Sequence, residues 1–306
     1  VRGEGCGMIA LKRLSDAVAD GDNILAVVRG AAINHDGRSG GLTAPNGPAQ
    51  EAVIREALAN SGVAPHEVSY VEAHGTGTSL GDPIEVRALG AALSEGRTQP
   101  LMIGSVKTNV GHLEAAAGIA GLIKAVLALQ HKEIPPHLHL KTLNPFIPWA
   151  ELPIAIPTER TPWATNRRFA GVSSFGFSGT NAHIILEEAP VVERKTVDVE
   201  RPLHLLTLSA RSETALKELS RRFTEDPSGF GNPKGLADTC FTANTGRSHF
   251  SHRLAVVADS VLQAREKLVA FAEGRESLGV MTGLMAQPTP LEVGFLFSGQ
   301  GAQYVG

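Results

Sequence analysis

VSYVEAHGTGTSLGDPIEVRALGAAL at residues 68–93, followed by LMIGSVKTNVGH at residues 101–112, is the stretch that decides the fold. Its apolar and β-branched runs predict strands over 68–73 and 101–106. Apolar residues at helical spacing predict helices over 83–93 and 113–130. Strands and helices that alternate in this order are typical of a layered α/β fold.

Outward from this stretch, further elements alternate in the same way. Strands are predicted over 7–14 and 24–32, and a helix is predicted from Pro48 to about Asn60, with Gly62 just past its end. After a proline-rich stretch, extended runs flank a glycine loop and predict a hairpin-like pair that closes the sheet, over 169–173 and 183–187. A smaller α/β unit follows, with predicted strands over 203–209 and 254–258 and predicted helices over 212–224 and 261–273.

Changes in composition predict where the domains end. Residues 191–201 are charged, rich in valine and without apolar periodicity, as expected for a linker. A polar, proline-rich step at 287–290 precedes a predicted strand at 293–297. We therefore expect domains over 1–189, 190–290 and 291–306, the last of them truncated. Because the sequence opens without methionine and closes just after a glycine-rich turn, we expect it to be a piece of a larger protein.

Composition and charge limit the classes of function. The chain has 306 residues, 42% of them hydrophobic, which is enough for real cores. The net charge of −3, from 28 basic and 31 acidic residues, predicts no nucleic-acid partner and no anionic membrane surface. Two cysteines, Cys6 and Cys240, exclude a disulfide scaffold and fit a reducing cytoplasm. The most apolar run, 113–129, carries Glu114 and Lys124, so a buried helix explains it better than a membrane span.

Two histidines stand out by position. His74 and His112 each follow a predicted strand and precede a predicted helix. Loops at the carboxyl ends of strands are rigidly supported, offer free backbone N–H groups at the next helix start and leave room for a ligand. Two such loops could hold one carbonyl oxygen between them. The alternative for each histidine is an ordinary core or surface residue.

The motifs around these histidines resemble a known family. Residues 72–78, 107–112 and 176–183 (GFSGTNAH) look like the signatures of β-ketoacyl synthases of modular type I polyketide synthases. The resemblance continues through residues 3–7, 41–48 and 297–303, the last of which is similar to the opening of a malonyl-type acyltransferase domain. It implies the C-terminal half of a ketosynthase with a thiolase-like layered fold, then a small α/β ketosynthase–acyltransferase linker subdomain, then the start of an acyltransferase.

The resemblance implies a decarboxylative Claisen condensation. A malonyl thioester loses carbon dioxide, and the resulting carbanion equivalent attacks an acyl chain held on a cysteine. His74 and His112 would donate N–H bonds to the enolate oxygen. Lys107 would be the active-site lysine that orients carboxylates or biases an imidazole, with an ordinary solvated lysine as the alternative. The implied partners are an acyl carrier protein with its phosphopantetheine arm, acyl and malonyl thioesters, and a second copy in a homodimer. No metal is expected, since His137 and His139 alternate without a third ligand.

Four further residues are candidates for binding the phosphopantetheine arm. Thr76 and Thr78 match family residues that contact it, and a tight glycine turn is the alternative. Phe177 matches the family's gate in the loop 175–181, where a rigidly packed aromatic residue is the alternative. Asn181 ends the same loop and is assigned to the same site.

The acidic residues near the histidines have a structural interpretation. Asp82, Pro83 and Glu85 have the spacing of a helix N-cap, first position and capping-box acid. We favour this interpretation over a supporting role beside the histidines, which the resemblance also allows. Glu114 is either a partner of Lys107 or a favourable acid in the first turn of a helix.

The nucleophilic cysteine is expected to lie upstream. Cys6 lies between glycines without a helix directly after it to activate its thiol, and Cys240 falls in a further predicted helix, within the linker. The resemblance places the nucleophile before residues 3–7, so the chain alone should lack the acyl-transfer step. Gln300 resembles the oxyanion-hole glutamine of an acyltransferase.

Three interpretations are compared. The first is a condensing-enzyme fragment of a polyketide synthase. The second, another thiolase-fold enzyme such as a degradative thiolase, fits poorly because Ser178 and Asn181 stand in the glycine loop where its second cysteine would be expected. The third is a noncatalytic piece that docks a carrier protein. The sequence upstream of this chain separates the three interpretations. A serine-rich turn with cysteine supports the first, and glutamine in that place indicates a decarboxylating loading domain. The absence of both residues favours a scaffold.

Overall fold

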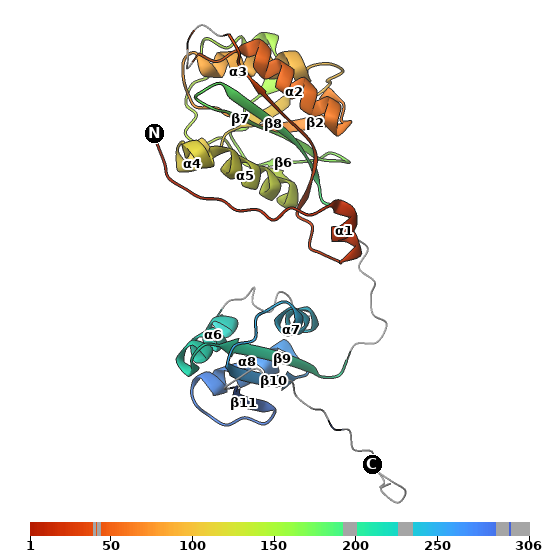
Figure 1. Ribbon diagram of the computed structural model, residues 1–306, viewed down its shortest axis with the longest axis vertical. Coiled ribbons are helices and arrows are strands. Elements are labelled where there is room, and N and C mark those ends of the chain that lie inside the picture. The colour runs from red at the N-terminus through yellow and green to blue at the C-terminus, as the bar shows by residue number, and fades with distance from the viewer. Residues whose placement is uncertain (39–40, 42–43, 192–200, 226–234, 286–293, 295–306) are drawn as a thin grey trace, which may run out of the picture. The chain divides into compact units, whose positions relative to one another are not determined.

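The computed structural model describes residues 1–38, 41, 44–191, 201–225, 235–285 and 294. The chain divides into two compact units, Val1–Glu193 and Arg194–Gly306, which are described separately (Figure 1). The predicted strand at 293–297, apart from Gly294, and the candidate Gln300 lie outside the described residues.

The first unit is built on a six-stranded mixed sheet with the order β1-β8-β7-β2-β3-β5. Strands β7, β2, β3 and β5 run parallel, whereas β8 is antiparallel to both β7 and β1. The predicted hairpin is confirmed, with Phe169 opposite Glu187 and Phe175 opposite Asn181, but it does not close the sheet, because β1 pairs with β8 and forms the edge. The strands are β1 (Ala26–His35), β2 (Val68–Glu72), β3 (Leu101–Gly104), β5 (Ile154–Ala155), β7 (Phe169–Phe175) and β8 (Thr180–Glu188).

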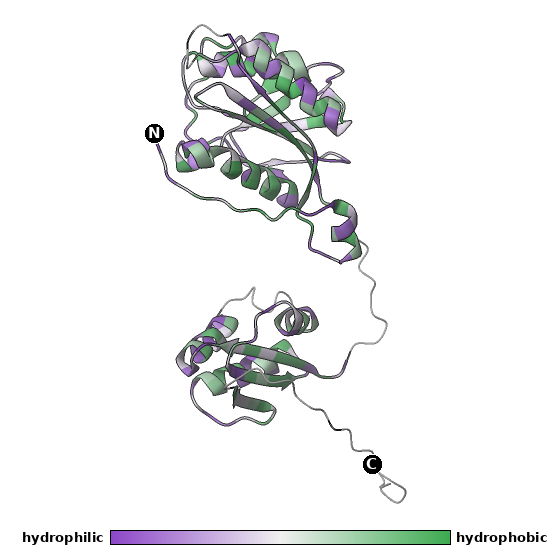
Figure 2. Cartoon of the chain, viewed as in Figure 1, coloured by the Kyte–Doolittle hydropathy of each residue, from purple (hydrophilic) through white to green (hydrophobic). Residues whose placement is uncertain are grey.

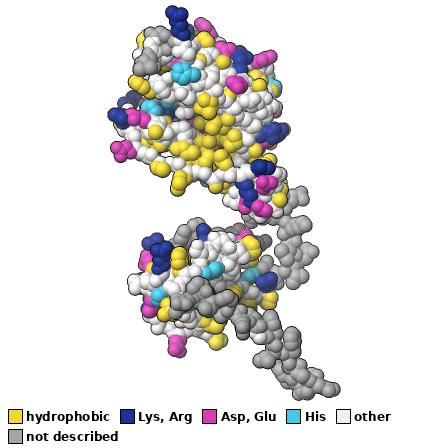
Figure 3. Space-filling view, in the orientation of Figure 1, with side chains coloured by type: hydrophobic (Ala, Val, Ile, Leu, Met, Phe, Trp, Pro, Cys, Tyr) yellow, Lys and Arg dark blue, Asp and Glu magenta, His cyan; other side chains and the backbone are white. Residues whose placement is uncertain are grey.

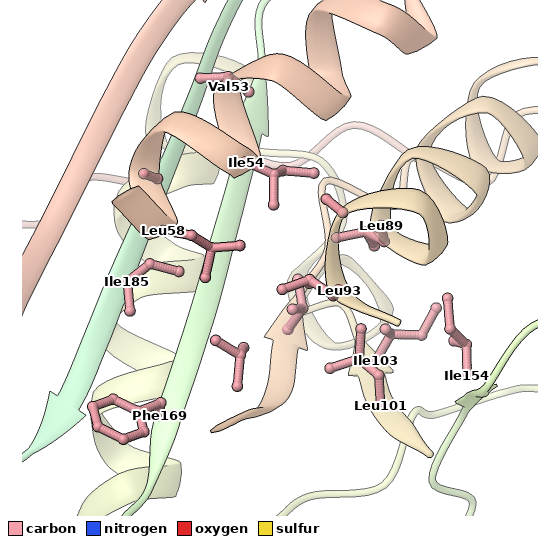
Figure 4. Packing of buried hydrophobic residues seen from close by; sticks show 14 of the residues in the cluster. Val53, Ile54, Leu58, Leu89, Leu93, Leu101, Ile103, Ile154, Phe169 and Ile185 are labelled. Atoms are coloured by element: carbon pink, nitrogen blue, oxygen red, sulfur yellow. The ribbon is translucent and has the colours of Figure 1, made fainter. Parts of the chain in front are cut away.

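Helices cover both faces of this sheet (Figure 1). On one face lie α2 (Gly47–Ser61) and α3 (Gly81–Leu93), and on the other lies α5 (Ala117–His131). The side chain of Asn46 caps α2 by accepting the N–H of Ala49, and Gly62 ends it with φ 65°, so the predicted helix and its stop are confirmed. Figure 4 shows the packing of α2 and α3 on the sheet through Val53, Ile54, Leu58, Leu89, Leu93, Leu101, Ile103, Ile154, Phe169 and Ile185.

The surface of α5 is apolar on more than its sheet-facing side. Its residues are hydrophobic over most of the helix (Figure 2), and hydrophobic side chains gather over it on the face seen in Figure 3. Among the described residues, no helix is long and apolar enough to cross a membrane.

The predicted strand over 7–14 is wrong. Residues 3–13 form no strand, and the short helix α1 (Leu14–Ala19) begins where the strand was expected to end. The segment lies across the side chains of α5: a Cβ added to Gly7 would come within 2.8 Å of Ile119. Since it lies against side chains and not beside a strand backbone, no ladder of hydrogen bonds forms.

Two boundaries near the histidines also differ from expectation. The strand predicted over 101–106 ends at Gly104, and Lys107 opens the short helix α4 (Lys107–Val110). The helix predicted over 113–130 is split into a 3₁₀ turn, η2 (Glu114–Ala116), followed by α5. Lys107 and His112 therefore do not end a strand, because the chain turns away from the sheet after Gly104.

The remaining elements of the first unit are short. They are the 3₁₀ turns η1 (Pro65–Glu67) and η3 (Trp149–Glu151), and the two-stranded sheet of β4 (Glu133–Ile134) and β6 (Thr161–Pro162).

The second unit has its own sheet and core. Its three antiparallel strands have the order β11-β10-β9 and comprise β9 (His204–Ala210), β10 (His252–Ala258) and β11 (Val280–Leu284). Its helices are α6 (Glu213–Glu225), α7 (Leu236–Thr245) and α8 (Val261–Ala272). The core includes Leu206, Leu216, Leu254 and Leu268. Both predicted strands are confirmed, as are the helices predicted over 212–224, over 261–273 and around Cys240, whereas β11 was not predicted.

Candidate active site

One cavity of about 1010 Å³ gathers nearly all the candidate residues of the described chain. It opens where β2 and β3 end, and its walls come from the loops after these strands, from α3 and from the β7–β8 loop. The candidates that line it are His74, Thr76, Thr78, Asp82, Glu85, Lys107, His112, Phe177 and Asn181. Glu114 does not line it.

The two histidines meet edge to face inside this cavity. Their ring centroids are 5.5 Å apart, with an interplanar angle of 84°. Phe175 also packs against His74, with ring centroids 5.6 Å apart and an interplanar angle of 55°. The N–H of His112 donates to Val1 O at 2.9 Å, and its carbonyl accepts from Gly3, so the N-terminal segment fixes its backbone.

Backbone contacts set which ring nitrogen of each histidine carries the proton. Nδ1 of His74 accepts the N–H of Phe175 at 3.4 Å, and Nδ1 of His112 accepts the N–H of Glu114 at 3.2 Å. A neutral imidazole that accepts at Nδ1 carries its proton on Nε2. Each ring therefore has an Nε2–H group available as a donor.

Both imidazoles are kept neutral. Burial lowers the pKa of His74 to about 3, with a further contribution from the positive charge of Lys107. The pKa of His112 is also lowered, first by burial and then by Lys107. Near neutral pH the pair offers two uncharged donors and no general acid of imidazolium type.

Lys107 is a partly buried cation beside this pair. Burial lowers its pKa, while Glu85, Glu72 and Asp82 raise it and Lys124 lowers it further. Because Lys107 is partly buried and interacts with three carboxyl groups, it is not an ordinary solvated surface lysine.

The capping interpretation of Asp82 and Glu85 is wrong. Helix α3 begins at Gly81 with Leu80 as its N-cap, and no side chain caps it there. Glu85 instead accepts the N–H groups of His74 at 2.7 Å and of Gly75 at 2.9 Å, one on each carboxylate oxygen. The sequence pattern failed because the carboxylate finds better donors on the neighbouring loop than on its own helix. Burial raises the pKa of Glu85 to about 7.

Asp82 and Thr78 shape the turn between them. Asp82 accepts the N–H of Gly77 at 3.0 Å, and burial raises the pKa of its carboxyl. Thr78 Oγ1 accepts the N–H of Gly81 at 3.0 Å. Gly77 has φ 76°, a conformation that glycine adopts without strain. The turn therefore has a structural role, and Thr76 and Thr78 both face the cavity.

Phe177 and Asn181 differ strongly in exposure. Phe177 is 78% exposed at the cavity, so it is not a packed aromatic residue of a rigid turn. Asn181 is 1% exposed, and its Nδ2 donates to Asn34 Oδ1 at 3.1 Å and to Asp36 Oδ1 at 2.7 Å. Asn181, the second residue of β8, thus joins the start of that strand to the end of β1 and to the loop after it.

The remaining candidates lie elsewhere. Glu114 pairs with Arg2 at 2.7 Å and not with Lys107, and it is the acid in the first turn of η2, where its φ is 49°. Cys6 is exposed and free, while Cys240 is buried in α7, where burial raises its pKa to about 11.

Sequence reasoning missed one residue next to the site. Glu72 is 2% exposed, and its carboxylate accepts the N–H of Val106, the residue before Lys107. A glutamate in an otherwise apolar strand was the signal that could have revealed it, since an unpaired charge is rarely buried.

Comparisons with known proteins agree on the family. Residues 25–141 match the family described as "Beta-ketoacyl synthase, C-terminal domain", and residues 204–268 match "CurL-like, PKS C-terminal". A phenolphthiocerol/phthiocerol polyketide synthase protein of Mycobacterium tuberculosis is 48% identical over 311 residues, which is 100% of this chain and 16% of that protein. The chain carries the C-terminal part of a polyketide synthase ketosynthase.

This ketosynthase is also similar to a second curated polyketide synthase and to a ketosynthase of known structure. Erythronolide synthase EryA2 of Saccharopolyspora erythraea is 48% identical over 99% of this chain and 8% of that protein. The ketosynthase from module 6 of the bacillaene synthase of Bacillus subtilis 168 matches with a TM-score of 0.78 and 37% identity. That match covers 89% of this chain and 50% of that one. The predicted thiolase-like α/β fold is therefore confirmed. The chain spans half the length of that solved ketosynthase and 16% or less of the length of the two curated relatives.

Proposed function

We propose that the protein carrying this chain catalyses the decarboxylative Claisen condensation of an acyl thioester with a malonyl-type thioester. The observation that carries the proposal is the pair of neutral Nε2–H donors of His74 and His112, whose rings lie 5.5 Å apart in one cavity. A reaction that develops negative charge on one thioester oxygen needs such a pair of preorganised donors.

In this mechanism the malonyl thioester breaks the bond to its carboxylate, and carbon dioxide leaves. The electron pair passes to the thioester carbonyl, whose oxygen accepts the two Nε2–H bonds. Reformation of that carbonyl drives attack of the α-carbon on the acyl thioester, and the cysteine thiolate leaves. Burial keeps both imidazoles neutral, and Lys107 adds to this because its positive charge lowers the pKa of each further.

We assign the thioester substrates to a phosphopantetheine arm on an acyl carrier protein. Thr76 and Thr78 offer hydroxyl groups along the cavity wall, and the exposed ring of Phe177 stands at the same cavity as a gate. Asn181 supports that loop through its bonds to Asn34 and Asp36. No other cofactor enters the proposal.

The nucleophilic cysteine is placed outside this chain. Cys6 is exposed and does not line the cavity, and Cys240 is buried in the core of the other unit.

We also propose that residues 190–290 are a ketosynthase–acyltransferase linker and that Gln300 belongs to the start of an acyltransferase. We propose further that the whole protein is a cytoplasmic homodimer.

The test is carbon dioxide release from a malonyl thioester by the complete synthase. His74→Ala and His112→Ala should each lower the rate by roughly 10²- to 10³-fold, the range measured for the loss of one oxyanion donor elsewhere. His131→Ala, which removes an exposed histidine at the end of α5, is the matched control and should leave the rate unchanged. Unchanged release in both active-site variants would refute the proposal and favour a noncatalytic docking role.

A further inference from the structure

A buried polar cluster lies directly behind the candidate active site. It consists of Glu72 on β2, Tyr70 two residues before it, and Lys124 on α5. Tyr70 Oη donates to Glu72 Oε2 at 2.6 Å, and Lys124 Nζ lies 2.9 Å from the same oxygen. Tyr70 is 0% exposed, and the side chain of Lys124 is only 14% exposed. None of the three lines the cavity.

The surrounding residues are shaped to hold this cluster. Trp163 packs edge-on against Tyr70, with ring centroids 5.8 Å apart, and its Nε1 donates to Ser69 Oγ. Two glycines provide the necessary room. A Cβ at Gly121 would lie 3.0 Å from Glu72 Cγ, and one at Gly104 would lie 3.0 Å from Tyr70 Oη and 3.4 Å from Lys124 Nζ.

The second oxygen of Glu72 points to the site. Glu72 Oε1 accepts the backbone N–H of Val106, where the chain leaves β3 and enters the turn that carries Lys107 and His112. Glu72 itself lies two residues before His74 on the neighbouring strand. One carboxylate therefore joins the two loops whose imidazoles must converge.

We propose that Glu72, held by Lys124 and Tyr70, is a positioning residue that sets the turn of Lys107 and His112 relative to His74. The inference rests on the proposed condensation. Its physical basis is that a charge-assisted bond to a backbone N–H inside a low-dielectric core is strong and directional. An error of about 1 Å in the placement of a reacting group can lower a rate by about 10²-fold.

The test compares two double variants in the complete synthase. Glu72→Leu with Lys124→Met removes the charge pair and the acceptor for Val106. Glu72→Gln with Lys124→Met removes the same charges but keeps a carbonyl oxygen for that N–H. Replacing both members of a buried pair by groups of similar volume avoids leaving an unpaired charge, so both proteins should fold. Thermal unfolding checks this for each.

The readout is the split between kcat and KM for decarboxylation of a malonyl thioester. The leucine variant should lose roughly 10- to 100-fold in kcat with an unchanged KM, because the cluster does not touch the cavity. The glutamine variant should recover most of that loss. Equal kcat in the two variants, or a leucine variant with the kcat of the wild type, would overturn the inference.

A control pair separates this role from general stability. Arg168 and Glu188 form another shielded ion pair, 2.6 Å apart, at the far end of the β7–β8 hairpin from Phe175. Arg168→Met with Glu188→Leu should leave kcat unchanged, and an equal loss there would assign the Glu72 effect to stability alone and so overturn the inference. If His74→Ala and His112→Ala lower decarboxylation as expected while the Glu72 variants keep the wild-type kcat, the proposed function stands and this inference fails.

Discussion

At the scale of single residues, burial sets the charge of the groups around the cavity. The same desolvation lowers the pKa of His74 to about 3 and raises that of Glu85 to about 7, because in each case it disfavours the charged form. The imidazole is therefore neutral at physiological pH, while the carboxyl that holds its backbone is close to half ionised.

Glu85 should make stability depend on pH. Its folded pKa of about 7 lies above the ordinary value of 4.5, so its contribution is fully present below about pH 4.5 and is lost as pH rises through 7. The difference between these two pKa values corresponds to on the order of 3 kcal/mol. Denaturant unfolding of the wild type and Glu85→Gln between pH 4.5 and 8 should show this slope only in the wild type. Parallel pH profiles would contradict the assignment.

At the scale of elements, the β7–β8 hairpin connects the core to the site. Its end at Phe175 donates the N–H that fixes His74, and its middle contains the fully buried His183. Ser173 Oγ lies 3.0 Å from His183 Nδ1 across the two strands. A Cβ at Gly171 would lie 2.9 Å from the His183 ring and 3.0 Å from Val71.

Gly171→Ala should therefore destabilise the first unit by about 1–3 kcal/mol, as overpacking of a filled core does. The measurement is the midpoint of chemical denaturation at constant slope. Gly283→Ala in β11 is the matched control, since an added Cβ there meets nothing within 4 Å. An equal effect of both substitutions would mean that strand propensity, not the His183 contact, decides the cost.

The elements also show where sequence patterns succeed. Helix α2 was predictable because Asn46, Pro48 and Gly62 are local signals that act within one turn of the chain. The strand predicted over 7–14 failed because alternation alone does not supply a neighbouring strand. The prediction that the strand continues to residue 106 failed for a related reason. The N–H of Val106 is bound by a side chain from another strand and not by a neighbouring strand backbone.

At the scale of the whole molecule, each described core cluster contains residues of one unit only. Two clusters lie in the first unit and one in the second. Leu254→Ala, at a residue 1% exposed in β10, should destabilise the second unit by about 2–5 kcal/mol. Decarboxylation by the complete synthase should be unchanged at temperatures below that transition. Calorimetry together with the activity assay checks both, and a proportional loss of activity would show that the second unit supports the site.

The sequence by itself determined most of the longer strands and helices, the hairpin after residue 168, the layered α/β class and the motifs around His74, Lys107 and His112. These follow from signals that act over a few neighbouring residues. Only the tertiary structure decided that the two imidazoles lie 5.5 Å apart, that both are neutral, and that Glu85 and Glu72 bind backbone N–H groups of the loops after β2 and β3. The physical reason is that convergence and burial depend on contacts between segments far apart in the chain, and only the folded core brings those segments together.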